Sequence, residues 1–193
     1  MRLPREQSVF DHVVLTASNE GQAAAYRAEL AHRGLHARST PAATVVPDPR
    51  GRRVGSGLST LLALESLAET WGREAEARGA PPADAASLFR DRHVCVIHAG
   101  GDSKRLPAYA AHGKIFTPLP IDAPDPRHAT LFDLLLEDFS RIPLPAEGRV
   151  VIATGDVYLD LGKHPRGFDS PGIVGVAWAS SPERGREARG LPR

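Results

Sequence analysis

Short runs of β-branched and other apolar residues alternate along this chain with longer stretches in which apolar positions recur every three to four residues. The short runs predict buried strands, which lie at residues 13–16, 43–46, 94–97 and 150–153, with a fifth at 173–178. The longer stretches predict helices, at residues 20–33, from 58 to about 71, and at 131–142. Strands that alternate with helices indicate an α/β fold with a mostly parallel sheet and flanking helices.

Polar and glycine residues mark where these helices begin and end. Asn19 is a good N-cap for the first helix, and Gly34 is expected just beyond its last turn. A short helix is expected to be capped near Asp84. On the second helix we expect the buried face to be formed by Leu58, Leu61, Leu64 and Trp71.

Composition and charge exclude several classes of protein. The 193 residues include 24 Lys and Arg against 23 Asp and Glu, so the net charge of +1 favours neither a nucleic-acid nor a membrane partner. The single cysteine, Cys95, excludes a disulfide framework and a cysteine-based zinc site. The eight histidines show no metal-ligand spacing. With no apolar run long enough for a membrane span, we expect a cytoplasmic protein.

The strongest chemical signal follows the third predicted strand. Residues 99–114, here called the glycine loop, begin with AGGDSKRL and end with Gly113 and Lys114. Paired glycines let a ligand approach the backbone N–H groups, and Arg105 and Lys114 can neutralise phosphate charge. The alternative is a tight turn with solvated basic side chains, but the spacing favours a nucleotide phosphate site. The segment is neither a Walker A loop nor part of a protein-kinase set, and the chain contains no GxSxG elbow.

Two further segments are candidates for the same site. Gly55, Ser56 and Gly57 precede the second helix, where a helix N-terminus can face an anion or a base edge. The alternative is a simple start of the helix with Ser56 as its cap. Asp156 ends the fourth strand and can hold Mg²⁺ beside a phosphate, although an Asp at a strand end also commonly starts a turn. Asp160 is a weaker second ligand.

These segments together resemble the GDP-L-fucose pyrophosphorylases, a branch of the sugar-phosphate nucleotidyltransferases. The glycine loop is similar to the signature AGGxGTRL with a later Pro-Lys, with Ser103 at the third glycine and Gly113 at the proline. The branch's other marks are VLTASN at residues 14–19, PDP with RVGSG at 47–57, and TGDVY at 154–158. The resemblance extends from about residue 11 to 182, and it implies a Rossmann-like nucleotidyltransferase fold.

The resemblance also implies a reaction and a set of site residues. GTP and L-fucose 1-phosphate would give GDP-L-fucose and pyrophosphate, with Mg²⁺ as cofactor and Asp156 as its ligand. Lys114 would bridge the α-phosphate and the leaving group, and Arg105 would act on the triphosphate with it. The nucleotide would be bound by Ala99, Gly100, Gly101 and Ser103, and its pocket would be lined by Gly55, Ser56 and Gly57.

Members of that branch are several times longer than this chain. We therefore expect residues 1–182 to form a partial nucleotidyltransferase domain, incomplete at its C-terminus, and residues 183–193 to be a disordered polar tail. The gene product would be truncated, split or frame-shifted, with the missing C-terminal part of the enzyme as a partner. Two alternatives stay open: a nucleotidyltransferase for another sugar phosphate, and a nucleotide-binding remnant without catalysis.

Overall fold

A four-stranded parallel sheet forms the centre of the molecule. The computed structural model describes residues 9–35, 41–81, 83–101, 112–120, 129–158 and 172–175. The strands are β1 (His12–Ala17), β2 (Ala42–Pro47), β3 (His93–His98) and β4 (Arg149–Thr154), in the order β2-β1-β3-β4. Each pair of neighbours runs parallel. The predicted α/β class and the first four of the five predicted strands are confirmed.

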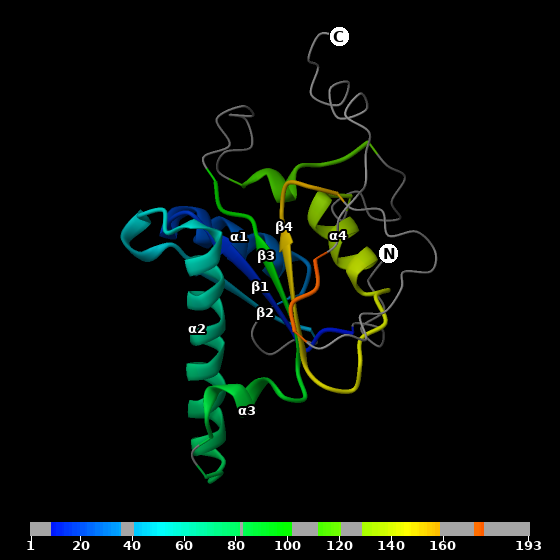
Figure 1. Cartoon of the computed structure of the whole chain (residues 1–193). Helices are drawn as coiled ribbons and strands as arrows, with labels where there is room; N and C mark the ends of the chain where they lie inside the picture. The colour runs from blue at the N-terminus through cyan, green and yellow to red at the C-terminus, as the bar shows by residue number, and fades with distance from the viewer. Residues whose placement is uncertain are drawn as a thin grey trace.

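Helices cover both faces of the sheet (Figure 1). One face packs against α1 (Glu20–His32) and α4 (Leu131–Phe139), through a cluster that includes Tyr26, Leu30, Phe132 and Leu135. The other face packs against α2 (Gly55–Ala77), with the short α3 (Ala85–Phe89) at its end. The 3₁₀ turn η1 (Pro49–Gly51) follows β2, and the 3₁₀ turn η3 (Lys114–Phe116) begins at the last residue of the glycine loop.

The helix ends have the local chemistry expected of them. The Asn19 side chain accepts a hydrogen bond from the Gln22 N–H at the start of α1, and Gly34 takes a φ of +71° just beyond its end. Asp84 caps α3 in the same way, through the N–H of Ser87. At α4, Thr130 and Asp133 form a reciprocal capping box. The expected caps Asn19 and Asp84 are confirmed, and the capping box of α4 is an additional finding.

The expected buried face of α2 is partly wrong. Leu58 and Leu61 are 48% and 63% exposed, whereas Leu64 is partly buried and Trp71 is 8% exposed. The face on the sheet is instead formed by Ser59, Ala63, Leu67 and Trp71, at intervals of four residues. The small Ser59 and Ala63 allow close approach to the sheet, and the Ser59 hydroxyl bonds the Asp48 carboxylate at 2.8 Å.

The expected fifth strand is not observed over its first part. Residues 173–175 are described and form no strand, and Ile173 is fully exposed. Residues 176–178 and the expected tail at 183–193 lie outside the described residues, as does Asp160. No helix in the described ranges combines the length and hydropathy required to cross a membrane.

Candidate functional site

The carboxyl ends of β3 and β4 bring two of the predicted segments into contact. The Gly155 N–H donates to the His98 carbonyl at 2.8 Å, so the turn after β4 lies against the start of the glycine loop. A Cβ at position 155 would lie 3.0 Å from the His98 carbonyl oxygen and 3.1 Å from both Ala99 Cα and Ile115 Cδ1. The carboxyl edge of the sheet, where α/β proteins bind ligands, therefore gathers the start of the loop, the residues after its end and the Asp156 turn.

The start of the glycine loop is held closely by backbone and side chains. A Cβ at position 100 would lie 3.0 Å from the Ser18 amide nitrogen, which explains a glycine there. The Tyr26 hydroxyl donates to the Ala99 carbonyl at 2.7 Å, and the Gln22 amide donates to the Gly101 carbonyl at 3.0 Å. The backbone at the predicted phosphate site therefore has two side-chain hydrogen bonds from α1.

Lys114 opens the turn η3 at the other end of the glycine loop. Gly113 precedes it with a φ of +72°, a conformation that suits glycine. The next two residues, Ile115 and Phe116, are buried at 1% and 4% exposure, whereas Lys114 itself is partly exposed. The two buried neighbours anchor the backbone of Lys114, whose side chain is not buried with them. Ser103 and Arg105 lie outside the described residues.

Gly55, Ser56 and Gly57 are exposed and form the first turn of α2. Val54 is the N-cap and makes no side-chain capping bond, so the alternative that Ser56 caps the helix is wrong. The turn after that, however, is tied to the same edge of the sheet. Ser59 bonds Asp48 beyond β2, and the Thr60 hydroxyl lies 2.9 Å from His98 Nε2. The start of α2 is thus adjacent to the glycine loop.

His98 is the last residue of β3 and stands directly before the glycine loop. Its Nδ1 lies 3.3 Å from the Thr16 hydroxyl and its Nε2 2.9 Å from the Thr60 hydroxyl. Burial lowers the pKa of His98, although the Asp48 carboxylate acts in the opposite direction. A neutral imidazole that joins β1, β3 and α2 fits a structural part in placing the loop.

Asp156 is exposed in the turn that follows β4. Within the described residues, no three His, Cys, Asp or Glu side chains are grouped as a metal site. Mg²⁺ commonly takes one or two carboxylates and completes its coordination with substrate phosphates and water. The single carboxylate of Asp156 fits that donor set once a nucleotide supplies the remaining oxygens.

Two residues that hold this site were not identified as site residues in the sequence. Tyr26 is a natural core residue at helical spacing, and Gln22 is a polar residue in the first turn of a helix. The available signal is chemical: a buried tyrosine hydroxyl or glutamine amide needs a hydrogen-bond partner, and the carbonyls at the start of the glycine loop supply it.

The chain is similar to known proteins over most of its length. The family described as "Fucose pyrophosphorylase domain" matches residues 86–187 of the 193. The chain is 38% identical over 171 residues to the bifunctional fucokinase/GDP-fucose pyrophosphorylase of Arabidopsis thaliana, which covers 81% of this chain and 16% of that protein. It is 34% identical over 177 residues to the fucose-1-phosphate guanylyltransferase of Mus musculus, covering 89% of this chain and 27% of the relative.

The chain therefore spans well under a third of the length of either relative. No solved structure matches it at a significant level. The family match begins in α3 and includes β3, the glycine loop, α4 and β4, which carry most of the predicted site. This chain belongs to the fucose pyrophosphorylase family.

Proposed function

We propose that this chain binds GTP at the carboxyl edge of its sheet and transfers the guanylyl group to L-fucose 1-phosphate. The observation that carries the proposal is the contact between the ends of β3 and β4, where the Gly155 N–H bonds the His98 carbonyl at 2.8 Å. That contact puts the start of the glycine loop beside Asp156. Family membership and the name of the mouse relative supply the nucleotide and the sugar.

The proposed reaction is one displacement at phosphorus. An oxygen of the sugar phosphate attacks the α-phosphorus of GTP, the new P–O bond forms, and the bond to the β-phosphate breaks. Pyrophosphate leaves with the electron pair of that bond. Such a step needs no protein nucleophile, since positioning and neutralisation of charge lower its barrier.

Each predicted residue has a part in this proposal. Backbone N–H groups of Gly100 and Gly101 would face the phosphates, and Lys114 would stabilise negative charge on the α-phosphate and the leaving group. Arg105 and Ser103 would act from the part of the loop outside the described residues. Asp156 would hold Mg²⁺, which when bound offsets phosphate charge.

Gly55, Ser56 and Gly57 would line the nucleotide pocket from the start of α2. Their first-turn N–H groups form an exposed helix N-terminus, a position that suits polar or anionic groups.

The test is calorimetric binding of GTP, ATP, CTP and UTP with Mg²⁺, followed by pyrophosphate release with and without L-fucose 1-phosphate. GTP preferred over the other three, with release that requires the sugar phosphate, is the expected result. Release with a different sugar phosphate would instead indicate another nucleotidyltransferase. Binding without release would leave a nucleotide-binding protein that lacks catalysis, and no binding of any nucleotide overturns the proposal.

A further inference from the structure

We propose that one face of α1 fixes both ends of the glycine loop, and that Tyr26 is the positioning residue shared by the two ends. The inference rests on the proposed function, because it assigns these contacts to the placement of nucleotide-binding backbone. The face consists of Gln22, Tyr26, Glu29 and Arg33. Their spacing of four, three and four residues puts them on one side of a helix.

The first end of the loop is held by two carbonyl contacts. Tyr26 donates to the Ala99 carbonyl at 2.7 Å, and Gln22 donates to the Gly101 carbonyl at 3.0 Å. Gln22 is itself oriented, because its amide oxygen accepts from the N–H and the hydroxyl of Ser18 at 2.9 and 3.0 Å. In a trans peptide the carbonyl and the following N–H point in opposite directions. Tyr26 therefore turns the Gly100 N–H away from α1, which is the orientation a phosphate site on the far side requires.

The second end of the loop rests on the same tyrosine. A Cβ at position 113 would lie 2.1 Å from the Tyr26 hydroxyl oxygen, so the backbone of Gly113 passes directly over the ring edge. The ring also packs edge-on against Phe116, with centroids 5.4 Å apart. Lys114 stands between these two contacts. One side chain thus determines the distance between Ala99 and the residues around Lys114.

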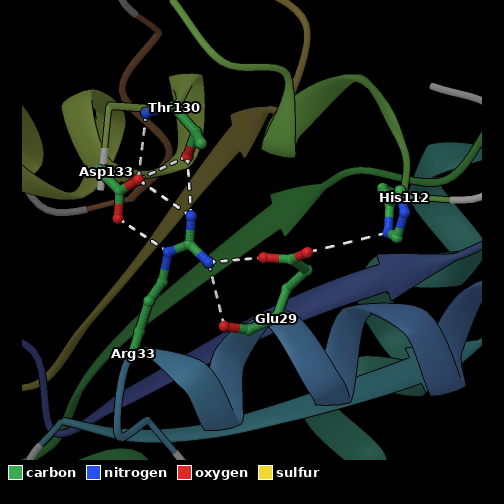
Figure 2. Close-up of polar contacts among 5 residues, drawn as sticks. All are labelled: Glu29, Arg33, His112, Thr130 and Asp133. Carbon is green, nitrogen blue, oxygen red and sulfur yellow. Dashed lines mark hydrogen bonds and ion pairs between the residues drawn. The ribbon is translucent and has the colours of Figure 1, made fainter. Parts of the chain in front are cut away.

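The remaining members of the face contact the last residues of the loop and the segment after it, and Figure 2 shows the contact of Glu29 with His112. Glu29 lies 3.8 Å from His112, and the Arg33 guanidinium lies 4.9 Å from the centre of the Phe116 ring. Arg33 is only 5% exposed in its side chain and is held by Glu29 and by Asp133 of α4. The last turn of α1 therefore anchors Phe116, two residues beyond Lys114.

Protonation of Tyr26 is secure near neutral pH. Burial raises the pKa of the Tyr26 phenol, so the hydroxyl remains a hydrogen-bond donor to the Ala99 carbonyl. The hydrogen bond from the Tyr26 hydroxyl to the Ala99 carbonyl therefore does not change with pH near neutrality.

The test deletes the Tyr26 hydroxyl alone, in Tyr26→Phe. The matched control is Thr70→Val, which removes a hydroxyl that donates to the Ser66 carbonyl at 2.8 Å within α2, away from the loop. Two quantities are measured on the full chain: GTP affinity with Mg²⁺ by calorimetry, and hydrogen exchange of single backbone amides. The informative amides are Phe116 and Thr117, which donate to the carbonyls of Gly113 and Lys114 at 3.3 and 3.1 Å.

We expect Tyr26→Phe to weaken GTP binding about three- to tenfold and to speed exchange at Phe116 and Thr117 by a similar factor. The amide of Leu134, which donates to the Thr130 carbonyl in α4, should exchange as in the unmodified chain. Thr70→Val should leave all three amides and the GTP affinity unchanged. If the Tyr26 hydroxyl only stabilised the fold, Tyr26→Phe would lower the melting temperature without speeding exchange at Phe116 and Thr117 relative to Leu134.

A second variant, Gln22→Met, tests the first end of the loop without changing Tyr26, since it keeps side-chain volume and removes the bond to the Gly101 carbonyl together with the two Ser18 bonds that orient Gln22. Unchanged GTP affinity in both Tyr26→Phe and Gln22→Met overturns the positioning proposal. If the unmodified chain binds no GTP, the proposed function is lost, and exchange at Phe116 and Thr117 alone then decides whether Tyr26 places the loop.

Discussion

The guanidinium of Arg33, at the end of α1, donates to both carboxylate oxygens of Asp133 in the first turn of α4, at 2.9 and 3.1 Å. Their side chains are 5% and 13% exposed, so the pair is largely removed from water. Burial alone would lower the pKa of Arg33, but the hydrogen bonds and charges of Asp133 and Glu29 outweigh it and raise that pKa. The guanidinium therefore stays charged and joins two helices that cover the same face of the sheet.

Arg33→Met should lower the free energy of unfolding by about 3 kcal/mol, because it leaves the largely buried Asp133 and Glu29 carboxylates without their cation. Urea denaturation measures the loss. The matched control is Arg27→Met on the same helix, where the ion pair with Glu20 is 47% and 70% exposed and should contribute under about 1 kcal/mol. Equal losses in the two variants would show that the buried Arg33–Asp133 pair contributes no more to the free energy of unfolding than the exposed Arg27–Glu20 pair.

Gly113→Ala should be one of the most damaging substitutions of a glycine in this chain. The position has a φ of +72°, and a Cβ there would lie 2.1 Å from the Tyr26 hydroxyl. Gly79→Ala is the matched control, because its φ is +76° and nothing lies within 4 Å of the added carbon. We expect a loss of about 1 kcal/mol for Gly79→Ala from backbone strain and a loss at least about 2 kcal/mol larger for Gly113→Ala. Chemical denaturation of both variants measures the difference. Similar losses would mean that the Tyr26 side chain moves away from the added carbon at little cost in free energy.

Local signals in the sequence were sufficient for most of the fold. The run at 94–97 is continuous and apolar because β3 is buried on both faces, and Asn19 marks the start of α1 because its side chain caps the first turn. The carboxyl edge as the candidate site follows from parallel strands with glycines at their ends. These features depend on residues close together in the chain.

Features that depend on distant residues were not predictable in this way. The face that α2 buries is the one that packs on Val14, Val94 and Val96 of the distant strands β1 and β3, so counting leucines selected Leu58 and Leu61 wrongly. The contacts of Tyr26 with Ala99 and of Arg33 with Asp133 join positions 73 and 100 residues apart. The spacing of apolar residues along the chain does not predict such pairs. They are seen only once the structure places the helices on the sheet.

The corrected face of α2 predicts a large difference between two leucines. Leu67 is 2% exposed against the sheet, and Leu61 is 63% exposed. Leu67→Ala should lower the free energy of unfolding by about 2–4 kcal/mol through the cavity it leaves, whereas Leu61→Ala should change it by about 0.5 kcal/mol or less. Urea denaturation of the pair is the measurement. A loss at Leu61 comparable to that at Leu67 would show that Leu61 is buried, as the sequence pattern predicted.

His12 should make the stability of the chain depend on pH. It is 4% exposed at the start of β1, where its Nε2 lies 3.1 Å from the Thr44 hydroxyl and its ring meets the edge of Trp71. Burial lowers the pKa of His12 from 6.5 to about 4, although the Asp11 carboxylate acts in the opposite direction. Between these two values the unfolded chain binds a proton that the folded chain does not, so stability falls as the pH falls from 6.5 to 4.

The matched variant for this effect is His12→Gln, which keeps a polar group near Thr44 and cannot titrate. Between pH 7 and 4, the unmodified chain should lose up to about 3 kcal/mol more than His12→Gln, at 1.36 kcal/mol per unit of pKa shift. Denaturation curves at half-unit pH intervals give the two profiles. Parallel profiles for the two proteins would show that His12 titrates normally in the fold.

Lys114 should affect chemistry far more than stability, because its side chain is partly exposed while Ile115 and Phe116 supply the buried anchor of η3. In a chain with guanylyltransferase activity, Lys114→Met should lower kcat/KM for GTP by about a hundredfold or more, since it removes a cation from a site where negative charge develops. Arg105→Met should act in the same direction.

Lys114→Arg keeps the charge and should recover part of the loss, while Arg27→Met controls for the removal of a cation elsewhere. Pyrophosphate release and thermal unfolding, measured on the same preparations, separate turnover from folding. An unchanged kcat/KM in Lys114→Met would show that Lys114 takes no part in the reaction. The proposal that GTP reacts at the carboxyl edge of β3 would then be wrong.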